Sequence, residues 1–305
     1  MTMKSGNLWS RFRVLMVKII SLPIYLLDAA YDLVMAVFFT STQKAMVSGE
    51  QQVVTNLQMN IHKVQKSQSF PKVEANRNKG ALKKINALLK KPVSDSFMVS
   101  LGAETLAAIE EEPQNNDVLV KEYSPADVST SSFEDLVLNR HSVRNFSSQK
   151  VPVSVILKII ELAKQAPSVC NRQEWRVHCY QQKDDITRLL KLQNGNKGWG
   201  EVIENLLVIT CDNRKFTTSS ERNQGFIDGG MFAMNLILAA RSMGLETCCL
   251  NQSNYFFKDL LVHRAGKIPI YERIIMFIAI GYVNPPIKVA TSQRYKNETF
   301  LTTHQ

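Results

Sequence analysis

Two arginines and a serine lie within five residues, in the order Arg140, Ser142 and Arg144, directly after a segment with helical character. Guanidinium groups donate paired hydrogen bonds to phosphate oxygens, and a hydroxyl between them adds a further donor. This spacing predicts a site for a phosphate monoester. A solvated basic turn is the alternative interpretation, because short basic motifs are weak signals when they stand alone.

A second set of polar side chains, Ser168, Asn171 and Gln173, lies in a loop between a predicted helix and a predicted strand. Hydroxyl and amide groups both donate and accept hydrogen bonds, which suits the edge of a planar heterocycle. Since Ser and Asn also favour turns, a loop that satisfies its own hydrogen bonds is the alternative. Near the end of the chain, Arg294 or Lys296 would complete a phosphate clamp, or would belong to a solvated basic tail.

The elements that must position these groups begin at about Ser132, which can cap a helix through Leu138. Apolar residues at helical spacing predict a further helix from Val151 to Gln165. The apolar run 206–210 predicts a buried strand, and 274–282 predicts the last core strand. Between them, the helix predicted from Asp228 to Ser242 is apolar nearly all round, so we expect it to be central or to lie in a subunit interface.

The net charge of +10 is distributed unevenly along the 305 residues. Residues 1–91 carry 14 Lys and Arg against 4 Asp and Glu, whereas residues 92–131 carry 1 against 8. We therefore expect three parts: a basic helical region over 1–91, an acidic linker over 92–131 and a second domain over 132–305. The basic stretches lack interleaved aromatic residues for base stacking, which argues against a nucleic-acid partner.

Residues 8–39 are strongly apolar and follow basic residues, but Lys18, Pro23, Asp28 and Asp32 interrupt the run. Acidic groups at the middle of a bilayer are costly, so a spanning helix is disfavoured, and no cleavage site marks a secretory signal. Two interpretations remain open for this segment. It is either an interfacial helix bound to a membrane surface or an arm that docks on protein.

Five cysteines are present, an odd number without the spacing of a zinc site. This predicts reduced, mostly buried thiols in a cytoplasmic protein, which would be peripheral on the inner face of the membrane if 8–39 binds lipid. No motif pairs a histidine with a thiol or a hydroxyl. We therefore name no catalytic side chain and no metal ligand.

Four motifs in sequence order resemble the nitroreductase family of flavoproteins: Arg140-x-Ser142-x-Arg144, Pro167-Ser168-x-x-Asn171-x-Gln173, Asp228-Gly229-Gly230 with its apolar helix, and Gly281-Tyr282 followed by Arg294. The resemblance implies an α+β fold with a mixed sheet flanked by helices. It also implies a homodimer that binds FMN at the subunit interface and reduces a nitro, quinone or enone acceptor with NAD(P)H. The kinetic order expected from the resemblance is ping-pong.

The same resemblance implies roles for individual residues. Arg140, Ser142, Arg144 and Arg294 would hold the phosphate and ribityl chain of FMN, with His141 adjacent to them. Pro167, Ser168 and Asn171 belong to the loop that would reach the flavin from the partner chain, with Gln173 supporting it. Asn251 and Gln252 fall where the family brings backbone toward the reactive edge of the flavin.

Two departures from the family pattern support an alternative. Glu174 stands where the family usually has proline, and Asn251-Gln252 replaces a stretch that often carries glycine. The N-terminal part resembles the extension of nitroreductase-like proteins from bacterial polysaccharide gene clusters, around His62 to Ser67. The alternative, supported by the basic apolar N-terminus and the altered Asn251-Gln252 segment, is a non-catalytic, membrane-associated scaffold or flavin-binding partner in polysaccharide biosynthesis.

Overall fold

The computed structural model describes residues 49–72, 76–110, 119–124, 132–216, 219–252 and 254–304, together with five helical residues before them, Pro23, Leu26, Leu27, Ala29 and Ala30. The segment 8–39, expected to contact lipid or protein, therefore lies almost entirely outside the described residues. Among the helices within those ranges, none combines the length and the apolar character that a membrane span requires.

Four strands form the main sheet, in the spatial order β2 (Trp175–Tyr180), β3 (Leu206–Asp212), β5 (Glu272–Gly281) and β4 (Glu246–Asn251). All three pairings between these strands are antiparallel. A parallel component occurs at the β4 edge, where Ser142 forms an isolated bridge with Thr247. The mixed character expected of the sheet is thus limited to the segment that carries the Arg-x-Ser-x-Arg motif.

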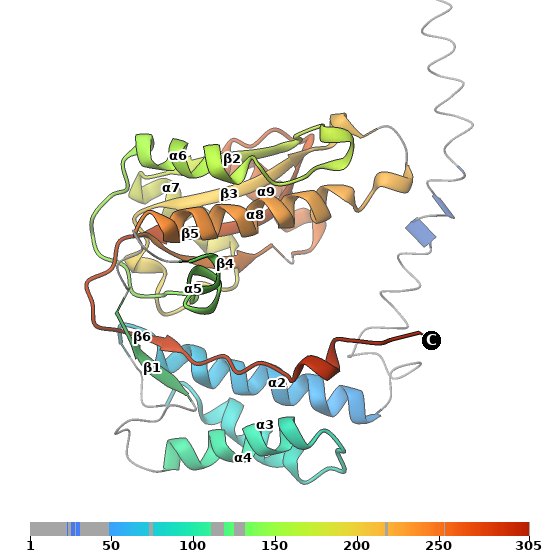
Figure 1. Cartoon of the computed structure of the whole chain (residues 1–305), viewed down its shortest axis with the longest axis vertical. Coiled ribbons are helices and arrows are strands. Elements are labelled where there is room, and N and C mark those ends of the chain that lie inside the picture. Colours follow the sequence, from blue (N-terminus) through green and yellow to red (C-terminus); the bar gives the residue numbers. More distant parts are fainter. Residues whose placement is uncertain are drawn as a thin grey trace, which may run out of the picture.

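Helices cover both faces of this sheet, which explains why β3 is buried along its whole length. Leu206 and Val208 face the cluster formed with α7 (Lys183–Leu192) and α9 (Phe256–Gly266). Leu207 and Ile209 face the cluster formed with α6 (Val153–Ala163) and α8 (Gln224–Ser242). The sheet is therefore the middle of three layers, with α6 and α8 on one side (Figure 1).

Helix α8 packs directly on the sheet, as its apolar composition predicts, and begins four residues earlier than expected, at Gln224. A Cβ atom at Gly229 would lie 2.9 Å from Cγ1 of Ile275 on β5, so glycine allows the close approach of helix and strand. Gly244 follows the helix with a φ of +74°, a conformation that glycine adopts readily.

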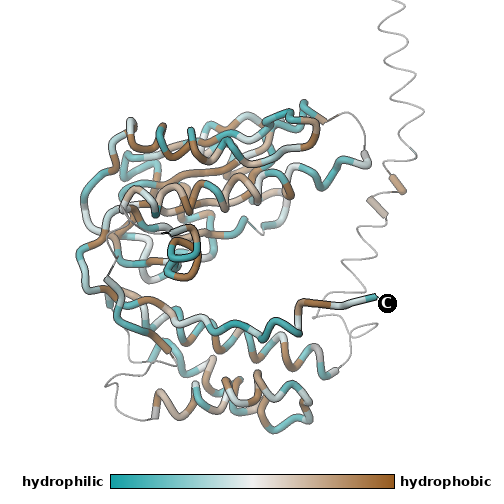
Figure 2. Tube along the Cα trace, viewed as in Figure 1, coloured by the Kyte–Doolittle hydropathy of each residue, from teal (hydrophilic) through white to brown (hydrophobic). Residues whose placement is uncertain are grey.

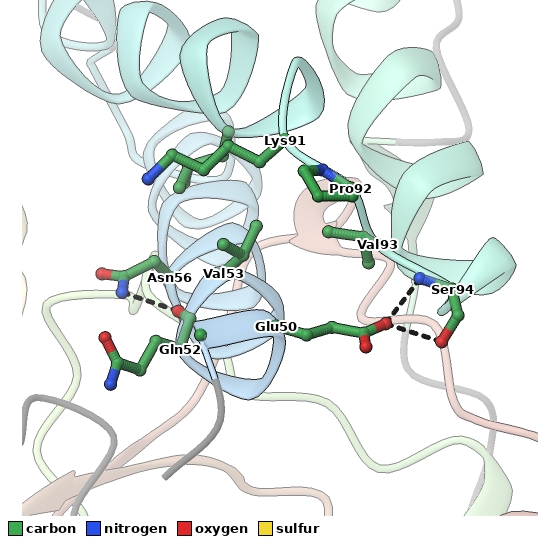
Figure 3. Close-up of a pocket in the computed structure, with 10 residues that line it drawn as sticks. Glu50, Gln52, Val53, Asn56, Lys91, Pro92, Val93 and Ser94 are labelled. Carbon is green, nitrogen blue, oxygen red and sulfur yellow. Dashed lines mark hydrogen bonds between the residues drawn. The ribbon is translucent and has the colours of Figure 1, made fainter. Parts of the chain in front are cut away.

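The N-terminal region contains three packed helices, α2 (Gly49–Gln68), α3 (Lys79–Leu89) and α4 (Ser96–Glu110). Their shared core is built from Leu57, Ile61, Val64, Ile85 and Met98. At one end the Glu50 carboxylate accepts hydrogen bonds from the backbone amide and the hydroxyl of Ser94, at 2.5 and 2.6 Å (Figure 3). This contact joins the first turn of α2 to the residues that lead into α4.

The structure differs from the linker expected over residues 92–131. Helix α4 packs within the N-terminal core, and β1 (Val120–Tyr123) pairs antiparallel with β6 (Ile287–Ala290). The chain after β6 continues alongside α2 (Figure 1), where Tyr295 lies against Phe97 with ring centroids 4.7 Å apart. The acidic composition of 92–131 therefore does not mark a boundary between independent parts.

Helix α5 (Phe133–Leu138) begins as the sequence predicts. The Ser132 hydroxyl accepts a hydrogen bond from the Asp135 amide at 3.1 Å, and the Asp135 carboxylate accepts one from the Ser132 amide. All five cysteines are free thiols. Only Cys211 and Cys248 are buried, so the expectation of mostly buried thiols is wrong. Cys179 and Cys249 are exposed on the edge strands β2 and β4, and Cys170 is exposed in a short 3-10 helix.

Candidate functional site

A groove of about 860 Å³ lies between α2, the segment after α5 and the segment after β6. This volume is within the range of small-molecule and cofactor sites. Four of the predicted site residues line it: Arg140, His141, Ser142 and Arg294. The described residues that line the groove include no Asp or Glu, whereas Lys121 adds a further cation. The groove is therefore suited to an anionic ligand.

Backbone contacts fix the segment that carries the first arginine motif. Besides the bridge to Thr247, the amide of Val143 donates a 3.0 Å hydrogen bond to the Thr247 carbonyl on β4. Val143 and Phe146 are buried in the hydrophobic core on one face of the sheet, which anchors the segment to the domain. The alternation that buries Val143 leaves Ser142 at the groove.

Arg144, which the sequence predicts to bind the phosphate, does not line the groove and is only 6% exposed. Its Nη1 donates a 3.1 Å hydrogen bond to the carbonyl of Ser142, but its buried Nε has no partner among the described residues. Burial and then the charge of Arg144 lower the pKa of Lys66 to about 8, and the same two causes lower the pKa of His62. Arg144 is thus close to two basic groups of α2.

His141 lies on the other side of the groove, and its pKa reflects the charges there. Burial, followed by the charges of Lys121, Arg140, Arg241 and Arg294, lowers its pKa to about 4. The ring is therefore neutral at pH 7, and it contacts the edge of the Tyr123 ring with centroids 5.0 Å apart. Burial is the larger cause of the lowered pKa, and the surrounding positive charge adds to it, which suits the binding of an anion.

A buried ion pair stands behind this wall of the groove. Arg241 and Glu246 are joined at 2.6 Å and both side chains are 3% exposed. The Tyr123 hydroxyl donates a 2.6 Å hydrogen bond to the same carboxylate oxygen. Burial raises the pKa of Glu246, and Arg241 and Tyr123 oppose that rise. The charge of Arg241 is therefore matched by Glu246, which also interacts electrostatically with Arg140 at the groove.

The loop predicted to reach a second ligand edge does not line the groove, so Pro167, Ser168, Asn171 and Gln173 are separated from the arginines within one chain. Cys170, Asn171 and Gln173 adopt φ values of 49°, 52° and 51°, which non-glycine residues rarely do. Ser168 Oγ accepts a 3.0 Å hydrogen bond from the Gln173 amide, and Gln173 Nε2 donates to Asn171 Oδ1 at 3.1 Å. The loop thus satisfies many of its own polar groups.

The distance between this loop and the groove can be judged from where each is connected to helix α8. The loop is attached at Asp228 in the first part of α8, since Oδ2 of Asp228 accepts a 2.9 Å hydrogen bond from the Val169 amide. Arg241, which acts on His141, lies in the last turn. The 13 residues between them correspond to about 20 Å along the helix axis.

Asn251 and Gln252 lie at the end of β4. The carbonyl of Asn251 accepts a 2.8 Å hydrogen bond from Gln193 Nε2, and Gln252 Nε2 donates to Asp259 at 3.1 Å. Oε1 of Gln252 is buried and has no partner among the described residues. Because Ser142 bridges to Thr247, four residues earlier on the strand, Asn251 is about 13 Å from that bridge along β4.

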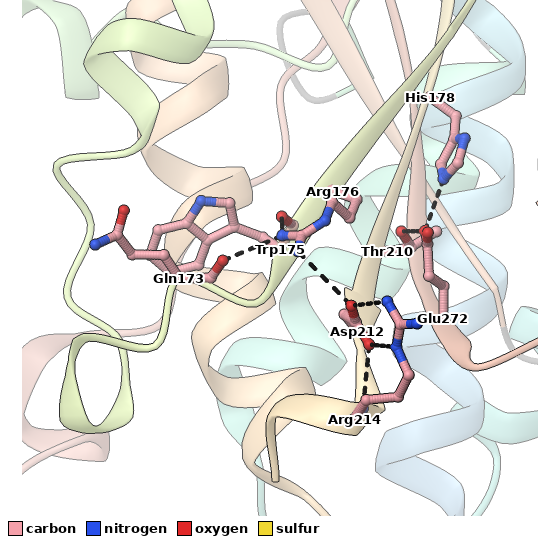
Figure 4. A network of polar contacts seen from close by, with 8 residues as sticks. All are labelled: Gln173, Trp175, Arg176, His178, Thr210, Asp212, Arg214 and Glu272. Carbon is pink, nitrogen blue, oxygen red and sulfur yellow. Dashed lines mark hydrogen bonds and ion pairs between the residues drawn. The ribbon is translucent and has the colours of Figure 1, made fainter. Parts of the chain in front are cut away.

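A polar network occupies the end of the sheet away from the bridge between Ser142 and Thr247 (Figure 4). Arg176 donates to the Gln173 carbonyl at 3.2 Å and lies 3.7 Å from Asp212, which also binds Arg214. Glu272 joins His178 at 2.7 Å and Thr210. None of these residues lines the groove, and their mutual pairing marks the network as structural.

Glu174, the residue that departs from the family pattern, is fully buried between this network and the loop. Neither carboxylate oxygen has a hydrogen-bond partner by distance and angle among the described residues. Burial, followed by the neighbouring Asp228, raises the pKa of Glu174 to about 7. Glu174 is therefore held partly protonated near neutral pH.

The sequence over residues 137–196 and 193–282 matches the Nitroreductase family. This part of the chain belongs to the nitroreductase family. The nitroreductase domain is 24% identical over 210 residues to a 4-nitrobenzoate reductase from Nocardioides sp. (strain LMS-CY), covering 53% of this chain and 84% of that protein. A 4-nitrobenzoate reductase from Pseudomonas putida is 27% identical over 199 residues, which cover 51% and 87%.

The fold of the nitroreductase domain is also found in a protein from Exiguobacterium sibiricum 255-15 that was solved in complex with FMN. The two structures share a TM-score of 0.50 at 19% identity, over 57% of this chain and 98% of that one. The α+β fold expected from the sequence is therefore confirmed for this part of the chain. The three N-terminal helices lie outside the matched residues.

Sequence reasoning did not select Lys121, His62 and Gln65, which line the groove. Lys121 lies in a segment that we expected to be a linker, and α2 lies in a part of the chain that the family pattern does not cover. The helical spacing of His62 and Gln65 was visible in the sequence. Nothing in it showed that this helix face meets the nitroreductase domain.

Proposed function

We propose that the protein is an FMN-dependent oxidoreductase that uses NAD(P)H to reduce a small organic acceptor. The observation that carries this proposal is the groove lined by Arg140, Ser142 and Arg294, with no described carboxylate in its lining. Membership of the nitroreductase family adds the redox chemistry. The FMN complex of a structural relative supports the choice of cofactor.

The residues present fit a phosphorylated flavin. Arg140, Arg294 and the Ser142 hydroxyl would bind the phosphate, because each adds a charged or polar donor at one groove. The unpartnered Nε of Arg144 is a buried donor that a ligand acceptor would satisfy. The apolar part of the lining, including Leu138, Met59 and Met234, suits a ring system.

The chemistry that FMN supplies when bound is ping-pong hydride transfer from NAD(P)H to an acceptor of the nitro, quinone or enone type. The protein binds and orients the flavin and sets the electrostatic environment around it. Arg144 would stabilise negative charge that develops near its guanidinium, in the manner of a preorganised oxyanion site. Asn251 and Gln252 would contribute at the far end of the same ligand, since β4 connects them to Ser142.

We further propose a homodimer in which the second copy supplies the loop with Ser168 and Asn171. An exposed apolar stripe on α8 supports this, formed by Phe226, Ile227, Met231 and Met234, which are 36–54% exposed. It continues through Met234 to Val137 and Leu138 of α5 at the groove, and α5 and much of α8 are coloured hydrophobic in Figure 2. A contiguous apolar surface of this kind marks an interface.

The physiological acceptor is proposed from two relatives that are named as 4-nitrobenzoate reductases. Nitroaromatic acids combine a reducible group with a carboxylate, and the positive field around His141 would favour such anions. We propose 4-nitrobenzoate as the first acceptor to assay. Contact of residues 8–39 with the inner face of the membrane remains a proposal from sequence, supported by basic residues at the start of an apolar run.

The test of the proposed function is the absorbance spectrum of the purified, full-length protein supplied with FMN. We expect the spectrum of bound oxidised flavin, which NADH or NADPH bleaches and which 4-nitrobenzoate or a quinone restores. A protein that binds no FMN would support the non-catalytic scaffold instead. Bound flavin that neither nicotinamide bleaches would support a flavin-binding partner without this activity.

A further inference from the structure

The N-terminal helix α2 is attached to the segment that carries Arg294. Nε2 of Gln65 donates a 2.8 Å hydrogen bond to Oε1 of Gln293, the residue before Arg294. Gln65 is only 3% exposed, so its side chain is fixed by packing. On the other side, Tyr295 packs against Phe97 of α4. The N-terminal region therefore holds both neighbours of Arg294.

One face of α2 also forms a wall of the groove. Thr55, Met59, His62 and Gln65 line it and recur every three or four residues, which is the spacing of a single helix face. His62 is the titratable group on this face. It lies close enough to Arg144 and Lys66 for their charges to lower its pKa.

The charges around His62 come from several elements. Lys66 belongs to α2, Arg144 and Arg140 to the segment after α5, Lys121 to β1, and Arg294 to the segment after β6. His141 and Tyr295 are the other titratable groups of the lining. No Asp or Glu is among the described residues that line the groove, so an anion bound there would meet mainly positive charge.

We propose that α2 is part of the ligand site of this nitroreductase domain, with His62 as a further anion-binding residue and Gln65 as the residue that positions Arg294 through Gln293. This proposal rests on the proposed function and extends it to a part of the chain that the family match does not include. It assigns the N-terminal region a role in binding.

The sign of the pH dependence follows from linkage. Before binding, burial and Arg144 favour neutral His62, whereas an anion in the groove favours the protonated ring. Binding therefore takes up a proton, and His62 contributes to affinity increasingly as the pH falls. The phosphate of FMN also titrates near pH 6. Because the FMN phosphate titrates in the same way for the variant and the wild type, the ratio of their affinities does not depend on it.

The experiment measures FMN affinity of the full-length protein by quenching of flavin fluorescence at pH 6 and pH 8. We expect His62→Gln to weaken binding about 10-fold at pH 6 and by less than 2-fold at pH 8, because a 10-fold loss corresponds to about 1.4 kcal/mol, near the lower end of what a hydrogen bond to a charged group contributes. His304→Gln, in the exposed C-terminal tail, is the matched control and should bind as the wild type does at both pH values.

Gln65 is tested by a double-mutant cycle. Gln65→Leu and Gln293→Leu should each weaken FMN binding several-fold, but neither should weaken it further when Arg294→Ala is present, because they act through that arginine. Riboflavin, which lacks the phosphate, should be bound equally by Gln65→Leu and the wild type. A change that persists in the Arg294→Ala background would assign Gln65 a general structural role and overturn its positioning role.

The outcomes separate this inference from the function on which it rests. A wild-type protein that binds FMN, with a His62→Gln ratio that is flat between pH 6 and pH 8, would overturn the role of His62 and leave the proposed function standing. A wild-type protein without FMN affinity would overturn both. Thermal unfolding of each variant verifies that the chain is folded before its affinity is compared.

Discussion

The guanidinium of Arg144 donates a 3.1 Å hydrogen bond to the carbonyl of Ser142, which leaves its buried Nε without a partner among the described residues. An unsatisfied buried donor is costly unless a ligand completes it. We expect Arg144→Ala to weaken FMN binding about 10- to 100-fold, because hydrogen bonds to charged groups contribute about 1.5–3 kcal/mol.

Titration of flavin fluorescence measures this change, with Arg188→Ala as the control. Arg188 forms an exposed ion pair with Asp185 away from the groove and should not affect binding. Arg144→Lys keeps the charge and should retain more affinity than Arg144→Ala. Equal affinity of Arg144→Ala and the wild type would remove Arg144 from the ligand site.

The apolar stripe on α8 predicts a concentration-dependent dimer. Ile227 is 54% exposed, and Ile227→Glu would place an unpaired charge in the interface. We expect dissociation to become easier by at least about 100-fold, since an uncompensated buried charge costs several kcal/mol. Sedimentation velocity measures the equilibrium. Leu301→Glu, at a residue 70% exposed in the C-terminal tail, is the control, and a dimer that tolerates Ile227→Glu must use another surface.

The pair of Arg241 and Glu246 predicts a large stability effect. Glu246→Gln preserves the shape of the side chain but leaves the buried Arg241 charge unmatched, which costs about 3–5 kcal/mol. For a domain of this size we expect the midpoint of thermal unfolding to fall by about 10 °C. Glu161→Gln breaks an exposed pair with Lys164 and should shift it little. An unchanged midpoint for Glu246→Gln would mean that Glu246 is already protonated.

Glu174 predicts how stability depends on pH. Its pKa is raised to about 7 in the folded protein, first by burial and then by Asp228, so the folded state holds the proton more tightly than the unfolded chain. Its contribution is complete below the ordinary carboxyl pKa and is lost as the pH rises through about 7. Glu174→Gln should therefore stabilise the protein at pH 8 relative to the wild type, and much less at pH 5.

Urea unfolding at the two pH values measures the difference, and a gain of about 1 kcal/mol at pH 8 is expected from an unpaired buried charge that is removed. Glu201→Gln, at an exposed position, is the control. If the two pH values give the same difference between Glu174→Gln and the wild type, Glu174 does not titrate in this range.

Deletion of residues 1–39 tests the proposed membrane contact. We expect the full-length protein to cosediment with vesicles that contain anionic lipid, because basic and apolar residues lie together in this segment. The truncated protein should remain in solution and keep its flavin spectrum. Vesicles without anionic lipid are the control. A truncated protein that still cosediments would place the contact elsewhere or show that there is none.

Local signals predicted most of the nitroreductase domain. The helix at Ser132 follows from its capping residue, and α6 follows from apolar residues at helical spacing. Strand β1, by contrast, has the sequence VKEY within an acidic stretch, so its conformation depends on the pairing with β6. Such pairing is a tertiary effect that intrinsic strand preference does not reveal.

The site was predictable to the extent that its residues share a motif. Arg140, His141 and Ser142 are consecutive, and Arg294 lines the same groove, whereas Arg144 of the same motif does not. The electrostatic interaction between His62 and Arg144 connects residues that are 82 positions apart in the sequence. No motif or residue spacing in the sequence predicts that these two residues lie close together. The loop at Ser168 remains a prediction for a second copy of the chain.

The pairing of β1 with β6 has a consequence for how this protein is handled and how it evolves. One strand precedes the nitroreductase domain and the other follows it, so a fragment beginning at Ser132 would leave the β6 edge without its neighbour and remove Tyr123 from the sheet core. Unpaired edges promote aggregation. A chimera that replaces the segment carrying β1 would therefore also need a C-terminal segment whose β6 pairs with the new strand.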